Sequence, residues 1–407
     1  MLPKYAYPSL RFIWLILAGM AVALAACTSE PEGLSAPQQP PGVLSSPTAT
    51  ATSPPSTHPP PPDRNGHTPA HCHPRSHGHR SHPTATLTPA PTATPNPTPQ
   101  PTGERGLSRG HVPQRLLAVM FDNHPQAYPQ AGLNRAVLVF EALAEYGITR
   151  YMGVFAPGAA PDAAVIGPVR SARTYFVQWA MGLGAVFVHA GGSPEGLSLA
   201  ESAPEIANMD ALHRAAQDYF YRNTSREAPH NLYTTGELLQ TFVADTGAEA
   251  NESDLAEQGF LFKHDAPADQ RPANQRLDYF YTFQGGVTES LTWEYDPQTN
   301  GYLRLRRDSP HIDEENGEQV WFKNLVVMEV EEVPIPGDPE KRLDLHVVGE
   351  GRARVFLDGM QREVRWRKPT AAAPLRWYDA QNHEIELNAG PVWVAAIQTF
   401  DNLSVGE

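Results

Sequence analysis

Two arginines stand three residues apart in the stretch IGPVRSART, at positions 170 and 173, directly after a Gly-Pro turn. Pro168 fixes its own backbone and disfavours a helical Gly167, so the chain turns here and a helix is expected to follow, with Ser171 as its N-cap. Arg173 would then lie in the first helical turn, where the helix dipole disfavours a cation. Such an arginine needs an anion, which either the protein or a ligand supplies.

Candidate anions lie upstream, in the segment 136–155. If this segment is a β-hairpin that turns at Tyr146, period-two alternation puts Glu141 and Glu145 on one face, both diagonal to Arg150. If the two glutamates are instead helical, their spacing of four again puts them on one face. In a strand their Cα atoms lie ~13 Å apart, which is too far for the acid/base pair of a glycosidase.

The charges in this region are explained either by internal ion pairs or by a polar ligand. Burial of several charges for stability alone is inefficient, so we expect a cleft lined by both signs of charge. His189, at the end of the predicted strand 185–189, is either a ligand contact or a core histidine. The candidate ligand-binding residues are Asp122, Glu141, Glu145, Arg150, Arg170, Arg173, His189, His230 and Asn231.

Several other motifs have a structural explanation beside a functional one. Ser193, before Pro194, is expected to cap a helix rather than act as a nucleophile. Thr234 and Glu237 match a capping box. The stretch HIDEENGE at 311–318 is a possible metal cluster but more simply a polar hairpin tip. Five tryptophans on predicted strands are expected in the core rather than stacked on sugars, at positions 293, 321, 366, 377 and 393.

The order of the predicted elements indicates an α+β protein with two folded parts. Residues 112–262 alternate apolar strands with amphipathic helices and predict an N-terminal domain with a mixed α/β sheet. A polar segment, 263–278, is the predicted linker. Residues 279–407 alternate apolar and polar positions, with a hairpin signal at Asn300-Gly301, and predict a smaller, mostly β C-terminal domain.

The first 111 residues predict a membrane anchor and a stalk. Residues 1–27 have a basic start, an apolar run and the ending Leu-Ala-Ala-Cys, which resembles a bacterial lipobox. This pattern predicts a cleaved signal peptide and a lipid, such as palmitate, on Cys27. An uncleaved membrane helix is the alternative. Residues 28–111 are rich in Pro and Thr and predict a disordered stalk. Its histidines, around His71-Cys72-His73, form either a weak metal chelator or an unconstrained linker.

Composition limits the function classes. The chain of 407 residues has a net charge of −14, and its first 111 residues are slightly basic, so the folded part is the acidic one. An acidic surface argues against nucleic acid as a partner. The glycine turn before the helix predicted at Ser193 has neither the Gly-Lys-Ser/Thr of a nucleotide P-loop nor a Gly-x-Ser-x-Gly elbow around Ser193. We therefore expect no cofactor and no structural metal.

The stretches DNHPQAYPQAGLNRAVLVFEALAEYGITRYMGVF, IGPVRSART, HAGGSP and APHNLY, in this order, resemble the YerB-type family of bacterial lipoproteins, a family of unknown function. Later stretches, GRARVFLDG, RWRKP and GPVWVAAI, are similar to its C-terminal module. The resemblance covers roughly residues 112–400. It implies a lipid anchor, an N-terminal α+β domain and a smaller C-terminal domain, and it places all nine candidate residues in shared motifs. Tyr146 and Asn382-His383 stand where the family has glycines.

These observations predict a lipoprotein held by its N-terminal lipid on the extracytoplasmic face of the cell membrane. We expect a non-catalytic binding module of the cell envelope, with an envelope protein or a wall polymer as its partner and a polar cleft lined by arginine and glutamate. The alternative is a hydrolase of cell-wall glycan or peptide, with Glu141 or Glu145 as the acid/base and His189 or His230 assisting.

Overall fold

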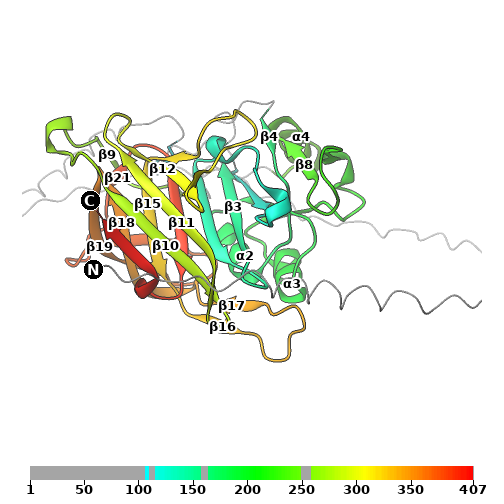
Figure 1. Ribbon diagram of the computed structural model, residues 1–407. Helices are drawn as coiled ribbons and strands as arrows, with labels where there is room; N and C mark the ends of the chain where they lie inside the picture. Colours follow the sequence, from blue (N-terminus) through cyan, green and yellow to red (C-terminus); the bar gives the residue numbers. More distant parts are fainter. Residues whose placement is uncertain (1–105, 110–114, 157–163, 249–257, 407) are drawn as a thin grey trace, which may run out of the picture. The chain divides into compact units, whose positions relative to one another are not determined.

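The computed structural model describes residues 106–109, 115–156, 164–248 and 258–406. Their dominant feature is a ten-stranded mixed sheet in the order β20-β19-β18-β15-β22-β2-β3-β1-β5-β6 (Figure 1). Its strands are β1 (Leu117–Phe121), β2 (Leu138–Leu143), β3 (Thr149–Phe155), β5 (Val186–His189), β6 (Ala207–Asp210), β15 (Asn324–Glu329), β18 (Gly349–Leu357), β19 (Met360–Lys368), β20 (Arg376–Tyr378) and β22 (Val392–Ile397).

The two halves of the chain meet inside this sheet. Strands β2 and β22 pair in parallel, with Leu138 opposite Val392 and Glu141 opposite Ala395. Strand β22 in turn pairs in parallel with β15. Buried on both faces, β2 and β22 read LVFEAL and VWVAAI, the near-continuous apolar runs that two covered faces require. The predicted linker 263–278 therefore separates segments that contribute strands to one sheet.

A second, six-stranded sheet has the order β13-β12-β11-β10-β23, with β14 paired to β12. Its strands are β10 (Arg276–Phe283), β11 (Gly286–Asp296), β12 (Gly301–Arg306), β13 (Ser309–Pro310), β14 (Trp321–Phe322) and β23 (Leu403–Gly406). Trp293 of β11 contacts Trp393 of β22 with ring centroids 5.3 Å apart, so this sheet packs on the central strands of the larger one. The predicted turn at Asn300-Gly301 is confirmed, since it joins β11 to β12.

Three α-helices occur in the described residues: α2 (Thr174–Gly182), α3 (Pro194–Ser202) and α4 (Gly236–Thr246). Trp179 of α2 stacks on Phe140 of β2 at 4.6 Å, which places α2 on the face of β2 opposite Glu141. Ser193 caps α3, as predicted, and accepts a hydrogen bond from the Gly196 amide. Thr235 rather than Thr234 caps α4.

Short elements complete the described chain. They are β4 (Val165–Ile166), β7 (Tyr221–Arg222), β8 (Leu232–Thr235), β9 (Phe262–Lys263), β16 (Glu332–Pro334), β17 (Leu343–Leu345) and β21 (Leu387–Asn388), with 3-10 turns at Pro125–Ala127, Leu133–Arg135, Gln217–Tyr219, Ala268–Gln270 and Phe400–Asn402. Strands β16 and β17 form a separate two-stranded hairpin. The fold is mostly β with few helices, and the N-terminal half contains the helices, as an α+β class implies.

Candidate functional site

The register of the β2–β3 hairpin decides where its charged residues point. Ala144 donates to the Ile148 carbonyl and Leu143 lies opposite Thr149, so Glu145, Tyr146 and Gly147 form a three-residue loop. The prediction put Glu141 and Glu145 diagonal to Arg150 on one face of the hairpin, and its register was wrong by one residue. Arg150 lies opposite Ala142 instead, and a shift of one residue moves a side chain to the other face of the sheet. Glu141 and Arg150 therefore lie on opposite faces.

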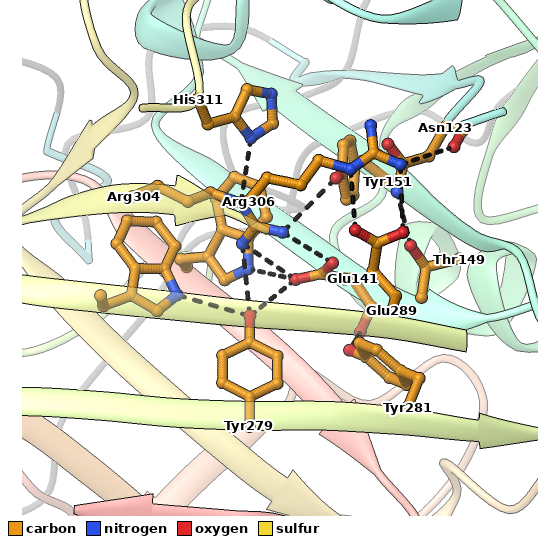
Figure 2. Close-up of polar contacts among 12 residues, drawn as sticks. Asn123, Glu141, Thr149, Tyr151, Tyr279, Tyr281, Glu289, Arg304, Arg306 and His311 are labelled. Carbon is orange, nitrogen blue, oxygen red and sulfur yellow. Dashed lines mark hydrogen bonds and ion pairs between the residues drawn. The ribbon is translucent and has the colours of Figure 1, made fainter. Parts of the chain in front are cut away.

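Glu141 lies between the two sheets and is fully buried. Its carboxylate accepts two hydrogen bonds from the Arg304 guanidinium, at 2.8 and 3.1 Å. The Tyr279 hydroxyl donates to the same carboxylate at 2.8 Å (Figure 2). The Trp393 indole N–H donates to it at 3.0 Å. Both carboxylate oxygens of Glu141 thus accept hydrogen bonds from the protein itself. The prediction that Glu141 faces a ligand, or acts as an acid/base, is wrong.

Arg304 of β12 is as fully buried as Glu141. The rings of Trp393, Trp293 and Tyr151 lie 4.3, 5.2 and 5.5 Å from the guanidinium carbon. Its Nε donates to Nδ1 of His311 at 3.1 Å (Figure 2). Burial and the Arg304 charge hold the pKa of His311 well below its usual value, so the ring is neutral and suited to accept this bond.

A chain of hydrogen bonds runs from this buried pair to the start of the loop after β1. His311 Nε2 contacts the Gln130 side-chain oxygen at 3.0 Å. The Gln130 amide nitrogen donates to the Asp122 carbonyl and to the Asn123 side chain, at 3.0 and 2.9 Å. Asn123 donates in turn to the Thr149 hydroxyl. The core of the protein thereby fixes the backbone that presents the Asp122 carboxylate.

Glu145 binds two arginines at the turn of the hairpin. It accepts a hydrogen bond from Arg150 and one from Nε of Arg173 at 3.0 Å. Burial raises the pKa of Glu145, but the two guanidinium charges outweigh it and lower the pKa to about 2. Glu145 is therefore ionised near neutral pH and bound by two cations, which makes it unsuited to act as a general acid. Arg173, not Ser171, occupies the N-cap position of α2.

Asp122 is the centre of a second polar cluster at the end of β1. Its Oδ2 lies 2.7 Å from Nδ1 of His230 and 3.3 Å from Nε of Arg170, and its Oδ1 accepts from the His124 amide. The His124 ring stacks on His230 with centroids 4.4 Å apart. Burial and the neighbouring His230 lower the pKa of His124. We call these residues, together with Arg150, the Asp122 cluster.

Arg150 belongs to this cluster by position. Phe121 pairs with Tyr151, so the adjoining residues Asp122 and Arg150 lie at the same edge of the β1–β3 pair. Only 4% of Arg150 is exposed, and its Nε and Nη1 are buried without a hydrogen-bond partner among the described residues. Buried donors of this kind cost free energy unless something accepts from them. An anion at this edge would satisfy them.

The remaining candidates are not part of the Asp122 cluster. His189 is fully buried, and its ring nitrogens contact the Gly191 carbonyl at 2.9 Å and the Asn208 side chain at 2.8 Å, which makes it a core histidine that supports the turn before α3. Asn231 accepts from Arg222 and donates to the Arg226 carbonyl, so it organises its own loop.

Comparison with known proteins supports the resemblance found in the motifs. Residues 101–249 match the N-terminal domain and residues 281–394 the C-terminal domain of a family described as proteins of unknown function, DUF3048. A relative in Bacillus subtilis (strain 168), named "Putative lipoprotein YerB", is 29% identical over 301 residues, which cover 72% of this chain and 84% of the relative. The chain belongs to the YerB-type family.

The fold of this YerB-type protein has a solved counterpart. The crystal structure of the YerB protein from Bacillus subtilis is similar with a TM-score of 0.61 and 26% sequence identity. The match covers 72% of this chain and 94% of that chain. The shared region thus includes most of the residues described here, in both halves of the chain.

Sequence reasoning missed the residues through which the C-terminal half of this YerB-type protein holds the N-terminal half. Arg304 was one of several alternating strand residues, and nothing local distinguished it. The stretch HIDEENGE is a polar hairpin tip, as predicted, since Ile312 pairs with Gln319, but its Asp313 is fully buried and accepts from the Gly132 and Asn134 amides at 2.8 and 2.6 Å. The described residues contain no group of His, Cys, Asp and Glu that could hold a metal ion.

The tryptophans are mostly core residues in this YerB-type protein. Trp293, Trp366, Trp377 and Trp393 are at most 3% exposed, and Trp321 is half-buried. Their burial supports the structural explanation over sugar stacking.

The predicted signal peptide, Cys27 and the stalk with its histidines lie outside the described residues. Among the residues that the structure does describe, no helix is long and apolar enough to cross a membrane.

Proposed function

We propose that this protein is an envelope lipoprotein, anchored through Cys27 on the extracytoplasmic face of the membrane, whose folded part binds an anionic group at the Asp122 cluster. The anchor is supported by the basic start, the apolar run and the Leu-Ala-Ala-Cys ending, and by the lipoprotein name of the Bacillus subtilis relative. The partner would be a wall polymer or an envelope protein that carries carboxylate or phosphate groups.

The single observation that carries the binding function is that Nε and Nη1 of Arg150 are buried without a hydrogen-bond partner among the described residues. Three arginines, at positions 150, 170 and 173, face only two carboxylates, Asp122 and Glu145. Arg170 is 27% exposed at its side chain, so the cluster is open to solvent on this side. A bound anion would accept from Arg150 and Arg170 together, and charge-assisted hydrogen bonds of this kind are among the strongest in proteins.

The acidic composition of the chain makes this site selective. A surface of net charge −14 repels polyanions in general. An anionic partner would therefore be attracted by the local arginines and not by the protein as a whole. Binding at this site would weaken with salt, because part of it depends on an exposed charge.

A hydrolase is the second candidate, and the Asp122–His230 pair is the observation that favours it. The carboxylate accepts from Nδ1 of His230, which leaves the lone pair on Nε2, the arrangement of a general base held by an acid. In this role His230, rather than Glu141 or Glu145, would act as the base.

The test uses the full-length chain in detergent, titrated with inorganic phosphate and with acetate and followed by calorimetry. We expect saturable binding that Arg170→Gln weakens roughly tenfold or more, because it removes a charged donor. Arg352→Gln is the matched control, since Arg352 is 66% exposed at its side chain and pairs with Glu329 elsewhere on the protein. Equal affinity in all three proteins, or no binding of either anion, contradicts the proposal.

The same proteins separate binding from hydrolysis when they are incubated with purified cell-wall fragments. Mass spectrometry of the bound fraction is expected to return intact fragments, captured less by Arg170→Gln. New cleavage products that disappear with His230→Ala would favour the hydrolase instead.

A further inference from the structure

A cleft of about 540 Å³ is lined by residues of the C-terminal half of the chain, and none of them belongs to the Asp122 cluster. Its walls are the turn between β10 and β11, the β16–β17 hairpin and Gln398. Figure 1 shows this hairpin beside the ends of the sheet strands. Apolar side chains form much of the lining, among them Phe283, Ile335 and Leu343. The size and lining suit a small ligand or a chain end.

Glu332, the first residue of β16, lines this cleft without a partner. Its Oε1 is buried and accepts no hydrogen bond from any described residue. Burial raises the pKa of Glu332 to about 7, and no neighbouring positive charge offsets the effect. A carboxylate in this position is costly for the fold, because it loses water and receives neither a donor nor a counter-ion in return.

The polar groups around Glu332 are already engaged with other atoms. Tyr175 donates its hydroxyl to the Leu143 carbonyl, and Tyr281 donates to the Glu141 carbonyl. Arg342, which also lines the cleft, is bound to Asp338 at 3.0 Å. Polar residues also line the cleft, among them Thr282, Lys341 and Gln398, but no described residue donates a hydrogen bond to the buried Oε1 of Glu332.

We propose that this cleft binds a primary ammonium group on an apolar carrier, such as the free amine of an amino acid or a peptide, with Glu332 as its counter-ion. The ammonium group supplies both the positive charge and the hydrogen-bond donors that Glu332 lacks. The apolar carrier packs against Phe283, Ile335 and Leu343. This site is independent of the Asp122 cluster, and its ligand has the opposite charge.

The test compares leucinamide with N-acetylleucinamide, which has the same side chain but no charged amine. Binding to the full-length chain in detergent is followed by calorimetry. We expect the wild type to bind leucinamide about tenfold more tightly than the acetylated form, since hydrogen bonds to charged groups are the strong ones. A tripeptide, Leu-Ala-Ala-amide, distinguishes the sources: tighter binding than leucinamide indicates a peptide amine, and equal binding indicates a free small amine.

Glu332→Gln removes the charge and keeps the shape. We expect it to reduce the affinity for leucinamide to that for N-acetylleucinamide. Glu331→Gln is the matched control, because Glu331 is the preceding residue, is 71% exposed at its side chain and pairs with His346 outside this cleft. It is expected to leave both affinities unchanged.

A second measurement needs no variant. In the wild type the preference for leucinamide should decline as the pH falls through about 7, because protonated Glu332 no longer attracts a cation. The proposal is overturned if the wild type binds both probes equally or binds neither, or if the preference persists unchanged in Glu332→Gln.

Discussion

Two glutamates of one sequence motif, four residues apart, differ in how completely the groups around them are hydrogen-bonded. Glu141 is fully buried between two sheets, and both of its carboxylate oxygens accept hydrogen bonds, from Arg304, Tyr279 and Trp393. Glu145 lies in the hairpin loop, where it serves two arginines, and one of these, Arg150, retains buried donors without a partner. The first region has donors and acceptors in balance, whereas the second has donors in excess.

This difference separates a structural ion pair from a candidate binding site. The Arg304 pair joins β12 of the second sheet to β2 of the first, so its interactions stabilise the association of the sheets. The arginines near Glu145 and Asp122 share two carboxylates at the edge of a sheet. Charge type and sequence spacing are similar in the two regions. The useful criterion is whether the hydrogen-bonding capacity of each group is used.

The largest loss of stability is expected when one partner of the buried Glu141–Arg304 pair is removed. Arg304→Met removes the guanidinium and leaves Glu141 buried without a counter-ion, which should lower the free energy of unfolding by about 4 kcal/mol. Urea denaturation followed by tryptophan fluorescence measures the loss.

A double variant provides the control for this prediction. Adding Glu141→Leu to Arg304→Met removes the isolated charge and should restore most of the lost stability, because an apolar pair can replace a buried ion pair. If the double variant is no more stable than Arg304→Met, the buried charge is not the cause.

An intermediate effect is expected at acid pH in the second region. The folded-state pKa of Glu145 is lowered from about 4.5 to about 2, so the ionised form stabilises the fold. This stability is fully present above pH 4.5 and is lost as the pH falls towards 2, by up to about 3 kcal/mol. Glu145→Gln should flatten this part of a plot of unfolding free energy against pH. A plot unchanged by the substitution would show that the pair with Arg150 and Arg173 contributes little.

The smallest of the three effects tests one donor in the balanced region. Tyr279→Phe removes the hydroxyl that donates to Glu141 at 2.8 Å and accepts from the Trp293 indole. We expect a loss of about 2 kcal/mol, typical of a hydrogen bond to a charged group. Thermal unfolding by circular dichroism measures it. Tyr146→Phe is the control, because Tyr146 is 50% exposed and its hydroxyl contacts only the loop around Pro339 and Glu340.

The strands, the helix caps and the charge clusters were predictable in outline because they depend on local patterns. The predicted strand 185–189 is β5 (Val186–His189), and Ser193 was correctly predicted as a cap. The face of the sheet on which Glu141 lies was not predictable, because it depends on whether the hairpin loop has two or three residues. Tyr146, in place of a glycine, adopts a positive φ of 54° and gave no sequence signal of the longer loop.

The partners of the site residues were predictable only in part. The pairing of Arg150 and Arg173 with Glu145, and of Arg170 with Asp122, was among the possibilities that the motif spacing allowed. Arg304 lies 163 residues from Glu141 in the chain, and their meeting follows from sheet-on-sheet packing that no local pattern encodes. Asp313 is a second example. It lies in a polar, acidic stretch, and no local pattern indicates that its carboxylate accepts from the amides of Gly132 and Asn134.

The parallel pairing of β2 with β22 has a consequence for biogenesis. While the ribosome is still synthesising residues beyond Leu143, one edge of β2 has no neighbour, because Val392–Ile397 does not yet exist. An open edge of apolar residues invites pairing with other chains. Native contacts between such distant residues also form slowly. A nascent chain is therefore expected to need protection by a holdase until β22 has been synthesised.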